Sequence, residues 1–257
     1  MEGSLVRYQP HGQERSEATL WLYQLAGARG RPTFAPKLFD RAPVPPPYAL
    51  FAFLFEDGDS ATAARARRRA SGTPCTTAEL AAAYDLLARG DSTAAAARAR
   101  ETFQNDPASE CAIGAMALDV LLATKRRRPD LLEKASRLDS TLRAAPASPY
   151  LTLMAGNMVV ARAFEQLGDP ARALNAVRRR PILFGPLLGW GRMLREEARF
   201  AALAGEREGA IRAFRLFVSL RADAEPSFQA DLLHAPSQLS RLERGNSDGW
   251  SVEHRGS

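Results

Sequence analysis

Cysteine and histidine are scarce in this chain of 257 residues, which has two of the former and three of the latter. Cys75 and Cys111 lie too far apart in the sequence to form a metal-binding motif or a disulfide framework. His11, His234 and His254 are equally scattered, and none has a complete set of ligand side chains near it in the sequence. We therefore expect no metal site, and we expect both thiols to stay reduced in a cytoplasmic protein.

Long apolar runs are missing too. The longest, 48–55, has eight residues, whereas a membrane-spanning helix needs about 20. The first residues do not form a basic stretch followed by an apolar one, so they do not resemble a secretion signal. β-Branched residues are sparse and alanine is abundant, which favours closely packed helices over sheets. These features predict a soluble, all-α protein.

No catalytic motif is complete. Residues 245–249 spell G-x-S-x-G, but they lack the strand before and the helix after that a nucleophile elbow requires. The phosphate-binding P-loop and the zinc motif H-E-x-x-H are absent from the sequence. Glu196 and Glu197 are adjacent in a predicted helix, so their carboxylates point to different faces; we expect them to be solvated or salt-bridged rather than an acid–base pair. We expect no catalytic residue, no cofactor and no enzyme activity.

Positive charge is plentiful and comes almost wholly from arginine. The formal net charge is +6, and three of the 35 basic residues are lysine, which leaves 32 arginines. Three clusters stand out: Arg65 with 67–69, Lys125 with 126–128, and 178–180. Each lies at or near the predicted C-terminal end of a helix, where cations suit the helix dipole. The alternative is that they bind nucleic acid, although aromatic side chains that stack on single strands are not interleaved with them.

The clearest local pattern is a helical hairpin in 193–226. Apolar residues recur at three- and four-residue spacing on both sides of Gly205, as expected for two amphipathic helices. Gly205 can adopt the left-handed conformation that ends a helix, and Glu206 then places negative charge at the start of the next one. We expect Pro226 to stop the second helix. A lone hairpin cannot bury its apolar face, so we expect similar hairpins beside it.

Weaker copies of this hairpin recur upstream. Turns are predicted at 58, 90, 129, 168 and 205, with spacings of 32, 39, 39 and 37 residues, which is typical of two-helix repeats. Where the residues flanking these turns are small, the two helices of a hairpin can approach closely. Five places after the turns stand Ala63, Ala95, Lys134, Ala173 and Ala210, and seven places before them stand Phe51, Ala83, Leu122, Ala161 and Ala198.

The predicted organisation has three parts. Segment 1–47 holds one helix, 17–28, and a proline-rich linker, and is less ordered than the rest. The repeat domain covers 48–243, and 244–257 is a polar tail. After residue 110 the expected helices are 111–124, 131–143, 149–167, 171–179, the two of the hairpin, and 228–242, the last interrupted or bent near Pro236.

The residues around these turns resemble the tetratricopeptide repeat. Segment 90–107 matches its pattern of Gly-Asp, a small residue five places on and a final Asp-Pro; segment 205–214 matches with Gly-Glu, Ala210 and Phe214. The resemblance implies a right-handed α-solenoid of antiparallel helix pairs. The stretch from Leu194 is also similar to the C-terminal repeat region of bacterial Ser/Thr kinases and of transcriptional activators with a bacterial activation domain. That similarity implies a non-catalytic interaction module of a bacterial regulatory system.

In tetratricopeptide proteins the first helix of each pair lines a concave groove, so the resemblance implies which side chains would face a partner. Most are guanidinium groups, which suit carboxylates and phosphates: Tyr84, Arg126, Arg127, Arg162, Glu165, Arg192, Arg195 and Arg199. The Asn/Lys pattern of the family's clamp for C-terminal carboxylates is absent. We therefore expect an acidic peptide or protein as the partner, with nucleic acid as the alternative. The opposing interpretation is that these arginines pair with Glu165, Glu196 and Glu197 and bind nothing.

Overall fold

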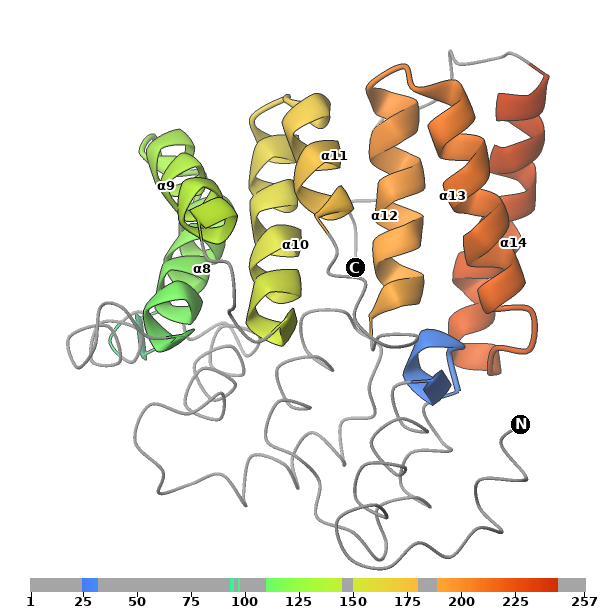
Figure 1. The fold of residues 1–257 in the computed structure, drawn as a ribbon, viewed down its shortest axis with the longest axis horizontal. Helices are drawn as coiled ribbons and strands as arrows, with labels where there is room; N and C mark the ends of the chain where they lie inside the picture. Colours follow the sequence, from blue (N-terminus) through green and yellow to red (C-terminus); the bar gives the residue numbers. More distant parts are fainter. Residues whose placement is uncertain are drawn as a thin grey trace, which may run out of the picture.

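The computed structural model describes residues 25–31, 93, 94, 97, 110–144, 150–179 and 189–244. Every regular element in these ranges is a helix (Figure 1). The bounds are α8 Glu110–Lys125, α9 Leu131–Ala144, α10 Tyr150–Gln166, α11 Pro170–Arg178, α12 Trp190–Leu203, α13 Arg207–Leu220 and α14 Pro226–Glu243. A helical turn at 25–28 lies within the expected helix 17–28. The prediction of an all-α protein is confirmed for this part of the chain.

Several expectations concern residues outside the described ranges. They include the predicted turns at 58 and 90, the first arginine cluster, Tyr84 and most of the segments 1–47 and 244–257. Between the predicted turn at 90 and residue 110, the described residues Thr93, Ala94 and Ala97 are helical.

The helices predicted after residue 110 all form, with bounds within a few residues of those expected. Pro170 occupies the first turn of α11, where its missing N–H removes no hydrogen bond. Asp169 caps the same helix, because its carboxylate accepts a hydrogen bond from the Arg172 N–H at 3.0 Å.

Two details of the last helix pair differ from the prediction. Pro226 does not stop α13, which already ends at Leu220; it lies in the first turn of α14, where its fixed φ suits a starting helix. Helix α14 is also not interrupted at Pro236, because it continues without a break from Pro226 to Glu243.

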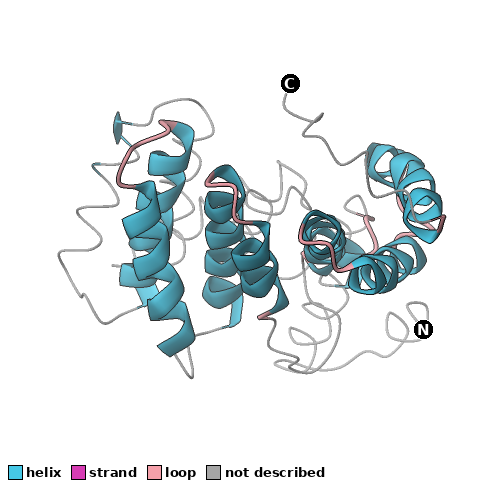
Figure 2. Ribbon diagram, turned by 90° about the horizontal axis from the view of Figure 1, so that it is seen from above, coloured by secondary structure: helices cyan, strands magenta, loops and turns pink. Residues whose placement is uncertain are grey.

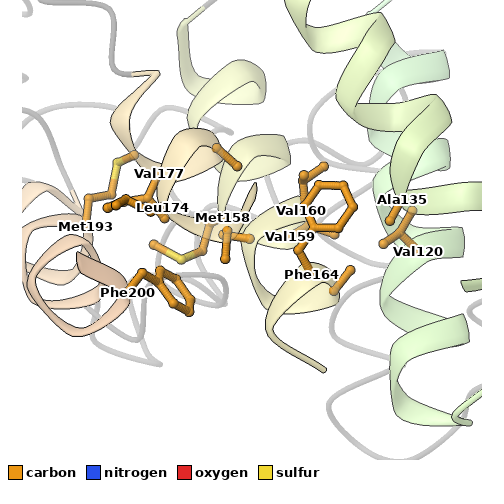
Figure 3. Close-up of a cluster of buried hydrophobic side chains, with 14 of the residues drawn as sticks. Val120, Ala135, Met158, Val159, Val160, Phe164, Leu174, Val177, Met193 and Phe200 are labelled. Carbon is orange, nitrogen blue, oxygen red and sulfur yellow. The ribbon is translucent and has the colours of Figure 1, made fainter. Parts of the chain in front are cut away.

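The helices pack mainly on their neighbours in the sequence: α8 on α9, α10 on α11, α12 on α13, and α13 on α14. In addition, α10 packs on α8, and α11 packs on α12, so adjacent pairs are joined. From above, the pairs stand beside one another along the molecule (Figure 2). Buried side chains form one continuous core that begins in α8 and reaches α14. Figure 3 follows it from Val120 and Ala135 past Phe164 to Phe200.

Small residues allow close contact between paired helices. The four alanines beside the last two turns are all fully buried, as predicted: Ala161, Ala173, Ala198 and Ala210. Gly156 lets α10 approach α9 closely, since a Cβ atom there would lie only 2.9 Å from Cδ2 of Leu142. Alanine and glycine at these positions therefore set the distance between the helices.

One hydrogen-bond pattern closes four helices. After α12, the Gly205 N–H donates to the Ala202 carbonyl at 3.2 Å, and the Glu206 N–H donates to the Ala201 carbonyl at 2.8 Å. Equivalent pairs of bonds surround Gly30, Arg127 and Gly168. In all four turns the central residue is left-handed, with φ between 49° at Arg127 and 79° at Gly205. This is the Schellman arrangement, which satisfies carbonyls that a helix end otherwise leaves unpaired.

The segment 25–31 lies against the far end of the described chain, beside the turn between α13 and α14 (Figure 1). The Glu225 N–H donates to the Gly30 carbonyl at 2.8 Å. Next to this bond the buried Arg221 guanidinium fills space that two glycines leave open. A Cβ atom at Gly30 would lie 2.3 Å from its Nη1, and one at Gly191 would lie 2.4 Å from its Nε.

Candidate functional site: an arginine cluster around Glu196

The candidate site is built on one face of α12 and the adjoining end of α10. On α12, Arg192 precedes Glu196 by four residues and Arg199 follows it by three, so all three side chains lie on one side of the helix. On α10, Arg162 and Glu165 are three residues apart and share a face in the same way. Helical spacing therefore gathers the charged residues of each helix into one short row, and the contact between Arg199 and Glu165 joins the two rows.

Glu196 is the centre of the cluster and is buried, with only 6% of its side chain exposed. Its Oε2 accepts from Arg199 Nε at 2.9 Å and from Arg199 Nη2 at 2.6 Å. Its Oε1 accepts from Arg195 Nη2 at 3.0 Å and lies 3.6 Å from Arg192 Nε. Burial alone would raise the pKa of Glu196, but the charges of the surrounding arginines outweigh it and hold that pKa far below its usual range: Arg199, Arg195, Arg192 and Arg162.

Arg199 joins the two helices. Besides its bonds to Glu196, it presents the outer edge of its guanidinium to Glu165 on α10, with Nη2 2.8 Å from Oε2 and Nη1 bonded to Oε1. Burial disfavours the charged form of Arg199, yet hydrogen bonding to Glu165 and the charge of Glu196 raise its pKa further above the ordinary value. The Arg199 guanidinium also stacks on the ring of Phe200, 4.3 Å from its centroid.

The cluster carries more positive than negative charge. Among the residues that the structure describes, four arginines and two glutamates meet here. The arginine side chains are neither fully buried nor fully exposed, and Glu165 is similarly placed, with 27% of its side chain exposed. Fixed guanidinium groups that still reach solvent can bind a further carboxylate or phosphate in forked geometry.

Five of the eight predicted groove residues meet in this cluster: Arg162, Glu165, Arg192, Arg195 and Arg199. Arg126 and Arg127 are exposed in the turn between α8 and α9. Tyr84 lies outside the described residues.

The central residue, Glu196, was not among the predicted groove residues. Its position three residues after Met193 and four before Phe200, both buried, is the signal that would have placed it on the buried side of α12.

Glu197 faces away from the cluster, which confirms that the two adjacent carboxylates are salt-bridged separately. It accepts from Arg178 Nε at 3.3 Å, and Arg178 also pairs with Glu206 at 2.6 Å. The bond to Glu206 is the main reason why the pKa of Arg178 lies above its ordinary value. These side chains, with Gly209, Arg212, Ala213 and Leu216, line an open pocket of about 320 Å³.

In the arginine cluster 178–180, the two described residues, Arg178 and Arg179, form ion pairs with carboxylates of the fold. Arg179 pairs with the buried carboxylate of Asp139, and its Nε donates to Asn157 Oδ1 at 3.2 Å. By contrast, the cluster at Lys125–Arg128 is exposed, with Arg128 paired to Asp130 at 2.7 Å. Arg178 and Arg179 lie at the C-terminal end of α11, as expected, and each guanidinium group also pairs with a carboxylate.

Comparison of the chain with protein-family models, with curated proteins and with solved structures finds no match. Among the described side chains, His, Cys, Asp and Glu nowhere form a group of three able to hold a metal ion. None of the described helices has the length and apolar character needed to cross a membrane.

Proposed function

We propose that this chain is a tetratricopeptide-like, right-handed α-solenoid that acts as a non-catalytic interaction module in a cytoplasmic bacterial regulatory system. On this proposal it binds an acidic segment of a partner protein. The repeat interpretation is supported by the spacing of the Schellman turns, whose left-handed residues are Arg127, Gly168 and Gly205, 41 and 37 residues apart. It is also supported by the buried alanines on either side of the last two turns.

The observation that carries the binding proposal is the gathering of four arginines from α10 and α12 around one buried carboxylate. Glu196 neutralises part of their charge and holds their guanidinium groups in place, so little side-chain freedom is lost when a ligand binds. The remaining positive charge would attract an acidic segment over several ångströms and orient it.

A short oligoglutamate peptide with a fluorescent label tests the proposal by fluorescence anisotropy. Arg195→Glu should weaken its binding by about tenfold or more, because one forked donor is lost and a repulsive charge replaces it. Arg212→Glu is the matched control: it changes the net charge equally, but at an exposed position on α13 outside the cluster. Equal losses of peptide affinity in the two variants would mean that binding depends only on the net charge of the protein, and the proposed site would be wrong.

Nucleic acid is the second candidate partner, because Lys125, Arg126, Arg127 and Arg128 form an exposed basic turn. Binding to duplex DNA would then weaken steeply as salt is added. Replacing Arg126 and Arg127 by glutamate should abolish such binding without changing affinity for the acidic peptide. Absence of DNA binding even at low salt would remove this candidate.

A further inference from the structure

We propose that Glu165 acts as an internal competitor, whose carboxylate occupies on Arg199 the place that a carboxylate of the acidic partner takes on binding. This inference rests on the proposed binding function and adds how the site is regulated. It makes Arg199 self-blocked in the free protein and open only to a carboxylate that can displace Glu165.

The two carboxylates on Arg199 differ in how firmly they are held. Glu196 is nearly inaccessible and is contacted by three arginines, so it forms the fixed floor of the site. The Glu165 side chain is more than four times as exposed as that of Glu196, and within the described residues it pairs with Arg199. If one carboxylate yields to a ligand, it is therefore Glu165, whose charge returns to water at little cost.

The geometry of the Glu165 contact is that of a bound ligand. Both carboxylate oxygens face the two Nη atoms of the guanidinium in forked, two-bond contact. An aspartate or glutamate of a partner can reproduce these two bonds one for one on the same edge. The exchange leaves the bonds between Arg199 and Glu196 in place, so the cluster need not reorganise.

The position of Glu165 in α10 offers its own helix no stabilisation. It lies in the last turn, beside carbonyl groups that carry the negative end of the helix dipole, where a carboxylate is unfavourable. The backbone carbonyl of Glu165 is itself part of the Schellman turn at Gly168. A glutamine would satisfy the helix better, so the carboxylate is explained by Arg199 and not by α10.

Glu165→Gln tests the inference, because it keeps the shape and removes the charge. Oligoglutamate should bind this variant about three- to fivefold more tightly than the wild type, which corresponds to the release of one part-exposed ion pair. Glu197→Gln is the matched control: it removes the same charge from the next helical face of α12, where the partner is Arg178. The control should bind with nearly wild-type affinity, and the peptide should raise the melting temperature of Glu165→Gln more than that of either other protein.

Equal peptide affinities of the two glutamine variants would contradict the role of Glu165 as an internal competitor. Weaker binding by Glu165→Gln than by the wild type would also contradict it, because Glu165 would then be a positioning residue for Arg199. Neither result would affect the proposed function as long as Arg195→Glu binds more weakly than Arg212→Glu. Conversely, if Arg195→Glu and Arg212→Glu bind the peptide equally well, the proposed binding site is wrong, regardless of the results for the glutamine variants.

Discussion

Arg29 and Asp223 form a forked ion pair across 194 residues of sequence, with Arg29 Nε donating to Asp223 Oδ1 at 3.1 Å and Nη2 bonded to Oδ2. The neighbouring Arg31 approaches the same carboxylate at 3.9 Å. With the backbone bond from Glu225 to Gly30, these contacts fix the segment 25–31 to the turn between α13 and α14. The turn between α13 and α14 is thereby held to a segment that lies nearly two hundred residues earlier in the sequence.

A double-mutant cycle measures this attachment. We expect Arg29→Ala and Asp223→Ala each to lower the free energy of unfolding by about 1 kcal/mol, since the pair is forked but partly exposed. The double variant should lose little more than either single one, which gives a coupling energy of about 0.5–1 kcal/mol. Urea unfolding followed by circular dichroism supplies the three differences, and strictly additive losses would show that the two side chains do not interact in solution.

A second prediction concerns two equivalent left-handed turn residues, Arg127 and Gly205, at which substitutions should change stability in opposite directions. Arg127→Gly should stabilise the protein by about 0.5–1 kcal/mol, because glycine adopts a positive φ without strain. Gly205→Ala should destabilise it by about 1–2 kcal/mol for the reverse reason. Apart from its neighbours in the chain, no described residue has an atom within 4 Å of a Cβ placed at Gly205, so the loss would reflect backbone conformation and not a clash.

Arg126→Gly is the control for the stabilising change, because it makes the same substitution one residue earlier, where φ is not positive. It should be neutral or destabilising. If thermal melts rank Arg126→Gly above Arg127→Gly, the left-handed assignment of the turn is incorrect.

The helices and turns could be predicted because they depend on local chemistry. Periodic apolar residues, Pro170 at a helix start and Gly168 and Gly205 at helix ends act within one or two turns of chain. The left-handed residue in the turn near 129 was missed because arginine rarely takes that role. Pro226 was assigned to the wrong helix end because proline both ends one helix and begins the next.

The contacts that define the site could be predicted only in part. Charge and helical spacing pointed to the arginines of α10 and α12, but not to Glu196 as their centre. That role depends on which face of α12 the neighbouring helices bury, and such packing involves residues far apart in the sequence. The same holds for Arg29 and Asp223, because no local pattern connects positions separated by nearly two hundred residues.

A buried ion pair between α9 and the end of α11 gives a third prediction. Asp139 is 6% exposed and pairs with both Arg179 and Arg143. Asp139→Ala should lower the free energy of unfolding by about 3 kcal/mol, because it leaves the Arg179 charge in a partly buried place. Arg143→Ala should cost less than about 1 kcal/mol, since that arginine is mostly exposed.

Urea unfolding of these two variants compares the stability lost when a partly buried charge loses its partner with the stability lost when an exposed ion pair is removed. Asp139→Ala removes the carboxylate that both arginines share and leaves Arg179 without it, whereas Arg143→Ala removes only the exposed partner and leaves Asp139 paired with Arg179. Similar losses in both would show that Arg179 reaches solvent when Asp139 is absent.

The buried Glu196 predicts how stability depends on pH. Its pKa is lowered from an ordinary value of 4.5 by the arginines around it, despite burial, which acts in the opposite direction. A carboxyl group with a lowered folded-state pKa binds protons more readily when unfolded, so its contribution is complete above about pH 4.5 and is lost as the pH falls. Between about pH 4.5 and pH 3 this one group should reduce the free energy of unfolding by roughly 2 kcal/mol.

Glu196→Gln removes the titrating group, so its free energy of unfolding should fall less steeply over that range than that of the wild type, although it starts lower. Glu133→Gln makes the same chemical change at an exposed position of α9 and should follow the wild-type curve. A ¹³C NMR titration of the wild-type Glu196 carboxyl group gives an independent reading and should show it still ionised well below pH 4.5. Parallel pH curves for wild type and Glu196→Gln, together with an ordinary titration by NMR, would mean that the arginines do not surround an ionised Glu196.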